Sequence, residues 1–397
     1  MEENFGVDAD QFAALVLQQL SAIGEPDAEY HPDGFEIVVG DLHLYLGNVF
    51  REAAELPAAE RDRRIANFVA GVREADAPDT WPDVRPLLRP ILRPNGFGLN
   101  TPADAAPPLT RPAFPFLDEL VAIDRPHSRS IVSATTLENW GVDADEVFAA
   151  ARENLTALAG SHGITGSGLL HFSDTGDGYC TSWPLIPGWL AGTGDGTHRP
   201  LAFMPDVDTL LIVPDTGDLT PLFAEVEQRY RNAVRPISPQ AYTIDDEGKV
   251  VPLDRIPHHR HQPQALRARC GLAITEYDAQ TTTFNESLER DLTFPHHPDL
   301  PPAFVASVIY VAADPGPYTL AVWGKDVEYL LPEADRILFC TEENGEMTPL
   351  LEAPFEAVAA HLNLTPIPQM TPRRYEVRTW PTQEDLTHLA STATRKD

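Results

Sequence analysis

The sequence predicts an α+β protein made of two or three internally related lobes, each with a small mixed or antiparallel sheet and packed helices. Three observations predict this fold: repeated segments, helix-start signals, and short apolar stretches that alternate with helical patterns. The chain has 397 residues, which is too long for one typical domain. Hydrophobic residues make up 43% of it, which is enough to form a core.

The first repeated segment marks the start of two predicted helices. Residues 4–11 (NFGVDADQ) are echoed by residues 139–146 (NWGVDADE). In each copy an aspartate, Asp8 or Asp143, stands three residues before a Gln or Glu, which is the spacing of a helix capping box. Apolar residues then recur at helical spacing, as Phe12, Leu15, Val16 and Leu20 and as Phe148, Ala151, Leu155 and Leu158.

A second pair of repeated segments predicts a buried strand, a glycine turn, a helix and an extended proline-containing end. Residues 204–213 (MPDVDTLLIV) match residues 331–340 (LPEADRILFC). Farther along, three further matches keep the same order: GDLTPL at 217–222 with GEMTPL at 345–350, Ile237-Ser238-Pro239 with Met370-Thr371-Pro372, and Tyr242 with Tyr375. This shared order predicts that the two regions arose by duplication.

The helices of this repeat have predicted start points. In the first copy we expect Thr220 as N-cap and Pro221 in the first helical position, where a missing N–H costs nothing. In the second copy Pro354 is expected in that position. The face of the first helix that is predicted to be buried carries Phe223, Val226 and Tyr230.

Proline-rich stretches are typical of rigid connectors. The chain contains 38 prolines, and some of them cluster in residues 77–82, 101–115 and 256–263. The last of these, which also carries histidines, is the predicted domain boundary. The predicted lobes are residues 1–132, 133–262 and 263–397.

Several segments of the first two lobes occur in an order found in a known family. They are residues 137–141 (LENWG), 151–155 (ARENL), 176–179 (GDGY), 203–213 (FMPDVDTLLIV), 236–239 (PISP) and 247–252 (EGKVVP). Together they resemble the bacterial family catalogued as domain of unknown function 1444. The resemblance covers about residues 1–255 and leaves residues 263–397 outside it. It implies a fold and a bacterial cytoplasmic origin, but the family has no established activity.

The charge composition argues against two classes of partner. The chain carries 29 Lys and Arg against 60 Asp and Glu, which gives a net charge of −31. Such a chain repels phosphate backbones and anionic membranes, so we expect no nucleic-acid and no membrane partner. An acidic surface favours a protein partner with a basic surface, although solubility alone also explains the charge. The oligomeric state is left open.

The cellular location is predicted from the N-terminus, the apolar runs and the cysteines. Residues 1–4 lack the basic and apolar regions of a signal peptide. The apolar run at 303–313 is much shorter than the roughly 20 residues of a membrane helix and predicts a buried strand. Cys180, Cys270 and Cys340 are scattered, which predicts buried reduced thiols. We therefore expect a cytoplasmic protein.

Two Asp-Thr-Gly triplets, at 174–176 and 215–217, are interpreted as turns. An aspartic protease would need them on two matched lobes, but they lie close together in sequence and each is followed by Asp. The histidines at 258, 259 and 261, with two more at 296 and 297, match no zinc pattern, so we predict a solvated linker and no metal site. Whether this histidine cluster binds metal is left open.

The candidate binding residues are acids and one tyrosine at turns. They are Asp174, Asp177 and Tyr179 in a glycine-rich turn, and Asp206, Asp208, Glu333 and Asp335 just before the two repeated strands. Hydrogen bonds from turn N–H groups to the carboxylates would also explain the acids. No catalytic residue and no cofactor is predicted.

The sequence favours a non-enzymatic interaction or scaffold protein with an acidic surface, because it contains no recognisable catalytic constellation. One alternative is a hydrolase-like enzyme with a site in a cleft between lobes, near residues 174–179 and 206–208. Another is a sensor that binds a small ligand or a metal. A scaffold predicts a stable protein partner, whereas an enzyme predicts a deep pocket with carboxyl groups of raised pKa.

Overall fold

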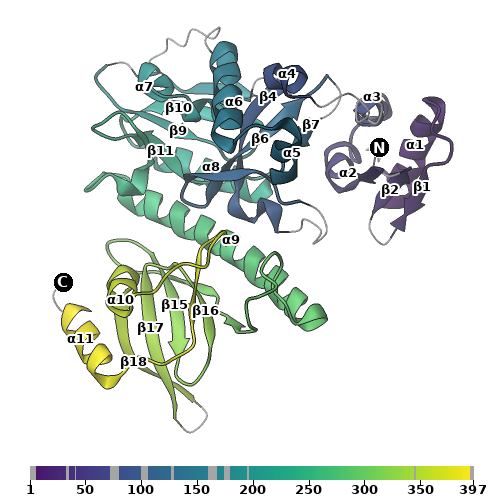
Figure 1. Ribbon diagram of the computed structural model, residues 1–397. Coiled ribbons are helices and arrows are strands. Elements are labelled where there is room, and N and C mark those ends of the chain that lie inside the picture. The colour runs from purple at the N-terminus through teal and green to yellow at the C-terminus, as the bar shows by residue number, and fades with distance from the viewer. Residues whose placement is uncertain are drawn as a thin grey trace, which may run out of the picture. The chain divides into compact units, whose positions relative to one another are not determined.

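The computed structural model describes residues 6–32, 35–40, 42–71, 80–99, 106–126, 129–159, 168–173, 179–194, 196–343 and 346–393. It is an α+β protein with several small antiparallel or mixed sheets and packed helices, as the sequence predicts (Figure 1). The chain divides into two compact units. Unit 1 comprises Met1–Pro90 and Val121–Ala157, and unit 2 comprises Ile91–Leu120 and Leu158–Asp397. The three lobes expected from the sequence stay a prediction.

The first part of unit 1 packs three helices with a three-stranded antiparallel sheet of order β1-β2-β3. Its elements are α1 (Ala9–Ala22), β1 (Glu29–His31), β2 (Glu36–Val39), β3 (Leu42–Tyr45), α2 (Gly47–Ala53) and α3 (Ala58–Ala70). The predicted capping box of α1 is confirmed, because the Gln11 N–H donates to Asp8 Oδ1 at 2.8 Å and the Asp8 N–H donates to Gln11 Oε1 at 3.2 Å. The predicted face of α1 is buried in the core of this part.

The second predicted helix start is also confirmed. Helix α6 (Ala144–Ala159) follows Asp143, whose Oδ1 accepts a hydrogen bond from the Glu146 N–H at 2.8 Å. Phe148, Ala151 and Leu155 on its predicted face are buried. The elements before it are α4 (Trp81–Val84), η3 (Arg85–Leu87), β7 (Arg129–Ile131) and α5 (Ala134–Trp140).

A four-stranded sheet has the order β4-β6-β5, with β7 also paired to β6. Its strands are β4 (Leu88–Pro94), β5 (Thr110–Phe114), β6 (Leu117–Asp124) and β7, and η4 (Asn95–Gly98) follows β4. The hairpin of β5 with the start of β6 belongs to unit 2 and positions part of the candidate site.

Unit 2 contains a five-stranded antiparallel sheet of order β12-β11-β9-β10-β8. Its elements are β8 (Leu170–Ser173), η5 (Cys180–Leu185), α7 (Trp189–Gly192), β9 (Pro200–Phe203), β10 (Thr209–Pro214), α8 (Thr220–Asn232), β11 (Ala241–Ile244), β12 (Val250–Pro252) and η6 (Leu253–Arg255). Helix α8 starts one residue earlier than predicted, with Leu219 as N-cap, because Asp218 accepts a hydrogen bond from the Thr220 N–H. Its predicted apolar face is buried.

The longest described helix is α9 (Gln262–Asp291), which the sequence pattern did not predict. It begins at the end of the predicted connector, with Pro263 in its first turn. Its buried residues fall on more than one face, because α9 packs against α8, η4 and η6 and also against β13 (Phe304–Val305), β14 (Val308–Val311) and β15 (Tyr318–Gly324). A helix that is buried on two sides has no single apolar stripe, so its sequence does not show the pattern of an amphipathic helix. Figure 1 shows α9 between the five-stranded sheet and the C-terminal sheets.

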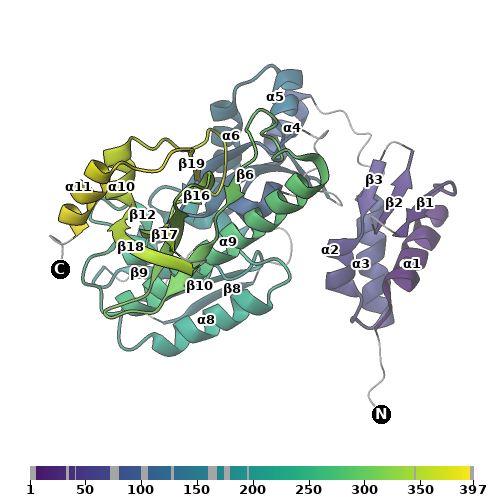
Figure 2. The same cartoon turned by 90° about the horizontal axis from the view of Figure 1, so that it is seen from below.

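Two further sheets complete unit 2, with the orders β13-β16-β19 and β14-β15-β17-β18. Their elements are β13 (Phe304–Val305), β14 (Val308–Val311), β15 (Tyr318–Gly324), β16 (Tyr329–Pro332), β17 (Arg336–Glu343), β18 (Glu346–Pro354), α10 (Phe355–Leu362), β19 (Arg374–Val377) and α11 (Gln383–Ala393). Strand pairs β13–β16 and β15–β17 are parallel and the other pairs are antiparallel. Helices α10 and α11 lie side by side next to these strands (Figure 2).

Two predictions for this region need correction, and one matched segment differs between the two copies of the repeat. Residues 303–313 form two short strands rather than one buried strand, because the chain passes from one sheet to the other after Ala306, and Ile309 and Tyr310 are left exposed. Pro354 is the N-cap of α10 and not its first residue. Residues 348–350 lie in β18, since they pair with β17, whereas the matching residues 220–222 begin α8.

Two other findings concern the whole described chain. Within the described ranges, no helix combines the length and the apolar content that crossing a membrane would require. The three cysteines are buried, as predicted, and burial raises the pKa of the Cys270 thiol to about 11.

Candidate functional site

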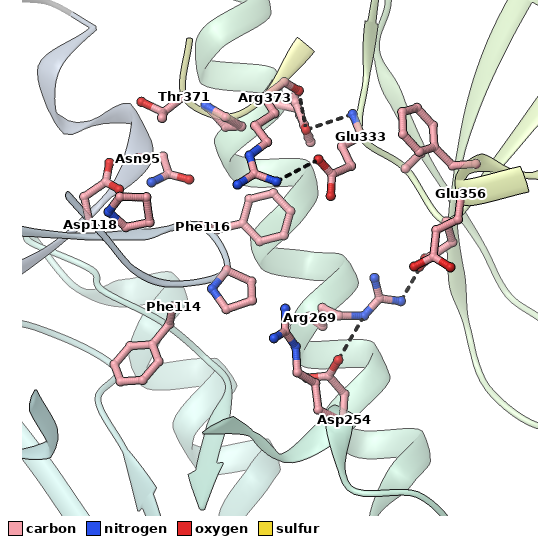
Figure 3. Close-up of a pocket in the computed structure, with 18 of the residues that line it drawn as sticks. Asn95, Phe114, Phe116, Asp118, Asp254, Arg269, Glu333, Glu356, Thr371 and Arg373 are labelled. Atoms are coloured by element: carbon pink, nitrogen blue, oxygen red, sulfur yellow. Dashed lines mark hydrogen bonds and ion pairs between the residues drawn. The ribbon is translucent and has the colours of Figure 1, made fainter. Parts of the chain in front are cut away.

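A pocket of about 650 Å³ lies within unit 2. Three groups of residues line it: Asn95, residues 112–116 and Asp118 from the β5–β6 hairpin region; Asp254, Arg255, Leu266, Arg269 and Tyr277 from η6 and α9; and residues 333–335, 354–356 and 371–373 from the C-terminal sheets. All three predicted lobes contribute residues. The volume is in the usual range for a small-molecule site. Figure 3 shows the polar and aromatic side chains that converge on it.

The β5–β6 hairpin presents one carboxyl group to the pocket and hides another. Glu119 is fully buried and forms an ion pair with Arg111, its partner across the hairpin, at 2.8 Å. Successive side chains of a strand point to opposite faces. Asp118 therefore faces away from that pair, toward the pocket. Asn95 approaches the same hairpin, because its N–H donates to the Phe116 carbonyl oxygen at 3.0 Å.

Asp118 is a carboxyl group almost removed from water, with 4% of its surface exposed. Burial raises its pKa to about 6, although the Asn95 side chain offsets part of this effect. Glu276 on α9 is equally buried. Burial raises the pKa of Glu276 to about 7, an effect that the Gly96 N–H, which donates to Oε2 at 2.7 Å, reduces and the nearby Asp118 charge increases. Glu276 therefore stays partly protonated near neutral pH, whereas Asp118 is mostly ionised there and takes up its proton near pH 6.

The arginines on α9 and after α10 are neutralised by pocket acids. Arg269 Nη2 lies 2.8 Å from Asp335 Oδ2, and Arg269 Nε lies 3.6 Å from Asp254 Oδ2. Burial opposes ionisation of Asp335, but hydrogen bonds from Arg269 and Thr319 outweigh it and keep the Asp335 pKa below its ordinary value. Arg373 Nη1 lies 3.7 Å from Glu333 Oε2. These ion pairs hold in place the side of the pocket that is formed by α9 and the C-terminal sheets.

A fully buried arginine, Arg374, lies next to the pocket residue Arg373 in the chain and forms hydrogen bonds that hold this segment in place. Its guanidinium lies 5.2 Å from the centre of the Tyr277 ring, and burial lowers its pKa to about 10. It makes four hydrogen bonds to neutral acceptors, namely Gln280 Oε1 at 2.6 Å, the Ala306 carbonyl at 2.7 Å, the Leu330 carbonyl at 2.9 Å and Thr281 Oγ1 at 2.7 Å. The Tyr277 hydroxyl donates to the Arg373 carbonyl at 2.8 Å. Residues 373 and 374 are thereby held against α9.

Two of the predicted binding residues, Glu333 and Asp335, line the pocket. Their counterparts in the first repeat do not. Asp206 accepts hydrogen bonds from the Asp208 N–H at 3.0 Å and from Arg229 Nε at 3.2 Å, so the expected turn bond is present. Asp208 forms an ion pair with Arg235 at 3.2 Å. The structure therefore does not bring the two acid pairs into one site.

The glycine-rich turn is only partly covered by the structure. Tyr179 is buried and precedes η5 with a left-handed φ of 51°. The predicted site residues Asp174 and Asp177 lie outside the described residues.

The histidine segment is packed, so the predicted solvated linker is wrong for two of its three histidines. His259 Nε2 lies 2.8 Å from Asp215 Oδ2, the His261 N–H donates to His259 Nδ1 at 3.2 Å, and His261 is buried. These contacts tie the start of α9 to the turn that follows β10. That turn contains the second Asp-Thr-Gly triplet, with Gly217 at a φ of 63°, as its interpretation as a turn predicts. Among the described residues, no group of three or more His, Cys, Asp and Glu is arranged to hold a metal.

Sequence reasoning missed Asn95, Asp118, Arg269 and Glu276. The available signal was weak: Asp118 and Glu119 interrupt an otherwise apolar strand, LDELVAID at 117–124, and a carboxyl group in such a strand needs a partner or a function. Glu276 lies in α9, which was itself not recognised.

Comparisons of the chain with protein-family models, with curated proteins and with solved structures found no match. The resemblance to the family of unknown function 1444 therefore stays a prediction. The geometry of the pocket is what remains to indicate a function.

Proposed function

We propose that the protein binds a small organic molecule in the pocket of unit 2. The observation that carries the proposal is the presence of a nearly dehydrated carboxyl group, Asp118, in the wall of a 650 Å³ pocket. Phe114, Phe116 and Phe355 supply apolar surface to the pocket. Small-molecule sites typically combine such a volume with aromatic walls and a few convergent polar groups.

The rigidity of the walls supports this proposal. The Arg269–Asp335 ion pair and the hydrogen bonds of Arg374 fix the α9 side and the C-terminal side of the pocket. A pocket that is already formed loses less conformational entropy on binding than one that must be ordered by its ligand.

Binding is tested by saturation-transfer NMR with three phenyl-bearing probes of different charge: 2-phenylethylammonium, 2-phenylethanol and phenylacetate. Ala113→Trp places an indole in the hairpin wall of the pocket, and Ala312→Trp is the matched control at an exposed position outside it. We expect at least one probe to bind the wild type and the control but not A113W. The absence of binding by all three, or equal binding to A113W, would overturn the proposal.

An acid–base enzyme is the second candidate, because Asp118 lines the pocket with a raised pKa and interacts with a second buried carboxyl group of raised pKa, Glu276. A carboxyl group whose pKa lies near the working pH can act as a general acid or a general base. Any probe that binds is therefore followed by NMR during long incubation with wild type and Asp118→Asn. Chemical change only with the wild type would support turnover, and unchanged probes would count against it.

The expectations of a scaffold role with a basic protein partner and of a cytoplasmic location stay predictions. So does the expectation that the chain binds no nucleic acid. They rest on the net charge of −31 and on the sequence alone.

A further inference from the structure

The charges of the pocket are unequally paired. Arg269 is neutralised by Asp335 and Asp254, and Arg373 is neutralised by Glu333. Among the described residues that line the pocket, Arg255 is the one arginine without an ion pair, and it is exposed next to Asp254 in the chain. The paired arginines are therefore poor receptors for an anionic ligand, since an anion would have to displace a protein carboxylate.

Asp118, unlike the paired arginines, has no side chain of opposite charge beside it among the described residues. It forms no ion pair with any described residue, and the Asn95 side chain is the one group that favours its ionised form. Asp118 interacts electrostatically with Glu276, which is also negative when ionised and forms no ion pair with a described residue. A carboxylate buried without a cation costs several kcal/mol, and a cation placed beside it recovers part of that cost.

The surfaces around Asp118 are aromatic. Phe114 and Phe116 come from the same hairpin, and the Phe116 ring stands edge-on to Tyr277 with 5.9 Å between ring centres. Phe114 packs on Tyr242 with 4.8 Å between centres. Aromatic rings bury apolar groups and attract cations to their faces. Figure 3 shows Asp118 and Asn95 on the same side of the pocket as the two phenylalanines.

We infer that the ligand is an organic cation, an ammonium or amidinium group on an apolar body, with the cationic group at the Asp118 carboxylate and the body against Phe114 and Phe116. This inference rests on the proposed function and specifies the ligand class of the same pocket. A bare metal ion is disfavoured, because one carboxylate among aromatic side chains offers too few oxygen ligands.

The test is isothermal titration calorimetry at pH 7.5 with 2-phenylethylammonium, 2-phenylethanol and phenylacetate, which share their ring and differ in charge. We expect the ammonium to bind at least tenfold more tightly than the other two. Asp118→Asn removes the charge at the site, and it should weaken the ammonium at least tenfold while leaving 2-phenylethanol nearly unchanged. Asp208→Asn removes the same charge from an exposed position outside the pocket and serves as the matched control.

A pH series adds a readout that a general loss of structure would not give. Asp118 is mostly protonated at pH 5 and mostly ionised at pH 7.5, so the affinity for the ammonium should fall about tenfold at pH 5 in wild type and D208N but not in D118N. Equal affinities for the ammonium and the alcohol, or an unchanged affinity in D118N, would overturn the cation inference and leave the pocket proposal intact. If none of the three probes binds the wild type, both proposals fail.

Discussion

Asp118→Asn is expected to stabilise the protein more at pH 8 than at pH 5. The folded state raises the pKa of Asp118 from 3.8 to about 6, so the ionised form is less favourable in the folded than in the unfolded state. As the pH rises, Asp118 loses its proton at a lower pH in the unfolded chain than in the folded protein. By proton linkage, the stability of the folded state therefore falls from about pH 3.8 upward until the folded carboxyl group is also ionised. An asparagine does not titrate and escapes this loss.

The size of the effect follows from the two pKa values. At about 1.4 kcal/mol per pH unit, the whole interval from 3.8 to 6 corresponds to roughly 3 kcal/mol at pH 8. About half of this loss has already occurred at pH 5, because the unfolded carboxyl is mostly ionised there. The stability of D118N relative to wild type should therefore increase by about 1.5 kcal/mol from pH 5 to pH 8. This difference does not depend on the intrinsic cost of the amide.

Urea unfolding followed by tryptophan fluorescence at the two pH values measures this quantity. Asp335→Asn is the control of opposite character, because ion pairing with Arg269 keeps the Asp335 pKa below its ordinary value. That group is ionised in both states from pH 5 to pH 8, so D335N should destabilise the protein by the same amount at both. A pH-independent effect of D118N would refute the assignment of Asp118 as a buried carboxyl with raised pKa.

Three further predictions concern stability and reactivity. Arg374→Met removes the donor of four hydrogen bonds to buried or partly buried acceptors. It should lower the free energy of unfolding by roughly 3–5 kcal/mol in urea titrations, and a loss below about 1 kcal/mol would contradict the bonding described for it. Asp8→Ala removes the capping box of α1 and should cost about 1 kcal/mol, seen as faster hydrogen exchange in the first turn of α1 and not in α9. Cys270 is buried and its pKa is raised, so it should react with a disulfide reagent at least tenfold faster in urea than in the folded state. Similar reaction rates in the two states would indicate that the thiol is exposed in the folded protein.

Local features of the fold were predictable from the sequence. The starts of α1 and α6 depend on side chains within three residues of each other, so Asp8 and Asp143 reveal them directly. Helix α9 was not predictable in this way, because its apolar and polar residues are distributed between neighbours on several sides. The change from helix to strand at residues 348–350 likewise depends on pairing with β17, which no local pattern encodes.

The candidate site shows the same division. The sequence pointed to Glu333 and Asp335 because each precedes a repeated strand, and both line the pocket. It also pointed to Asp206 and Asp208, whose partners are Arg229 and Arg235 near them in the first repeat. What distinguishes the two pairs is the position of α9 and of the β5–β6 hairpin, and this is a property of tertiary packing.

The pocket joins segments that are synthesised at very different times. The hairpin with Asp118 leaves the ribosome early, whereas Arg373 and Arg374 follow only after α9 and most of the C-terminal strands. Contacts between such distant segments close large loops, which makes their formation slow and places it late in folding. Until then Asp118 stands in water with the pKa of an ordinary aspartate. We therefore expect fragments that end before residue 371 to lack the proposed binding of a small molecule.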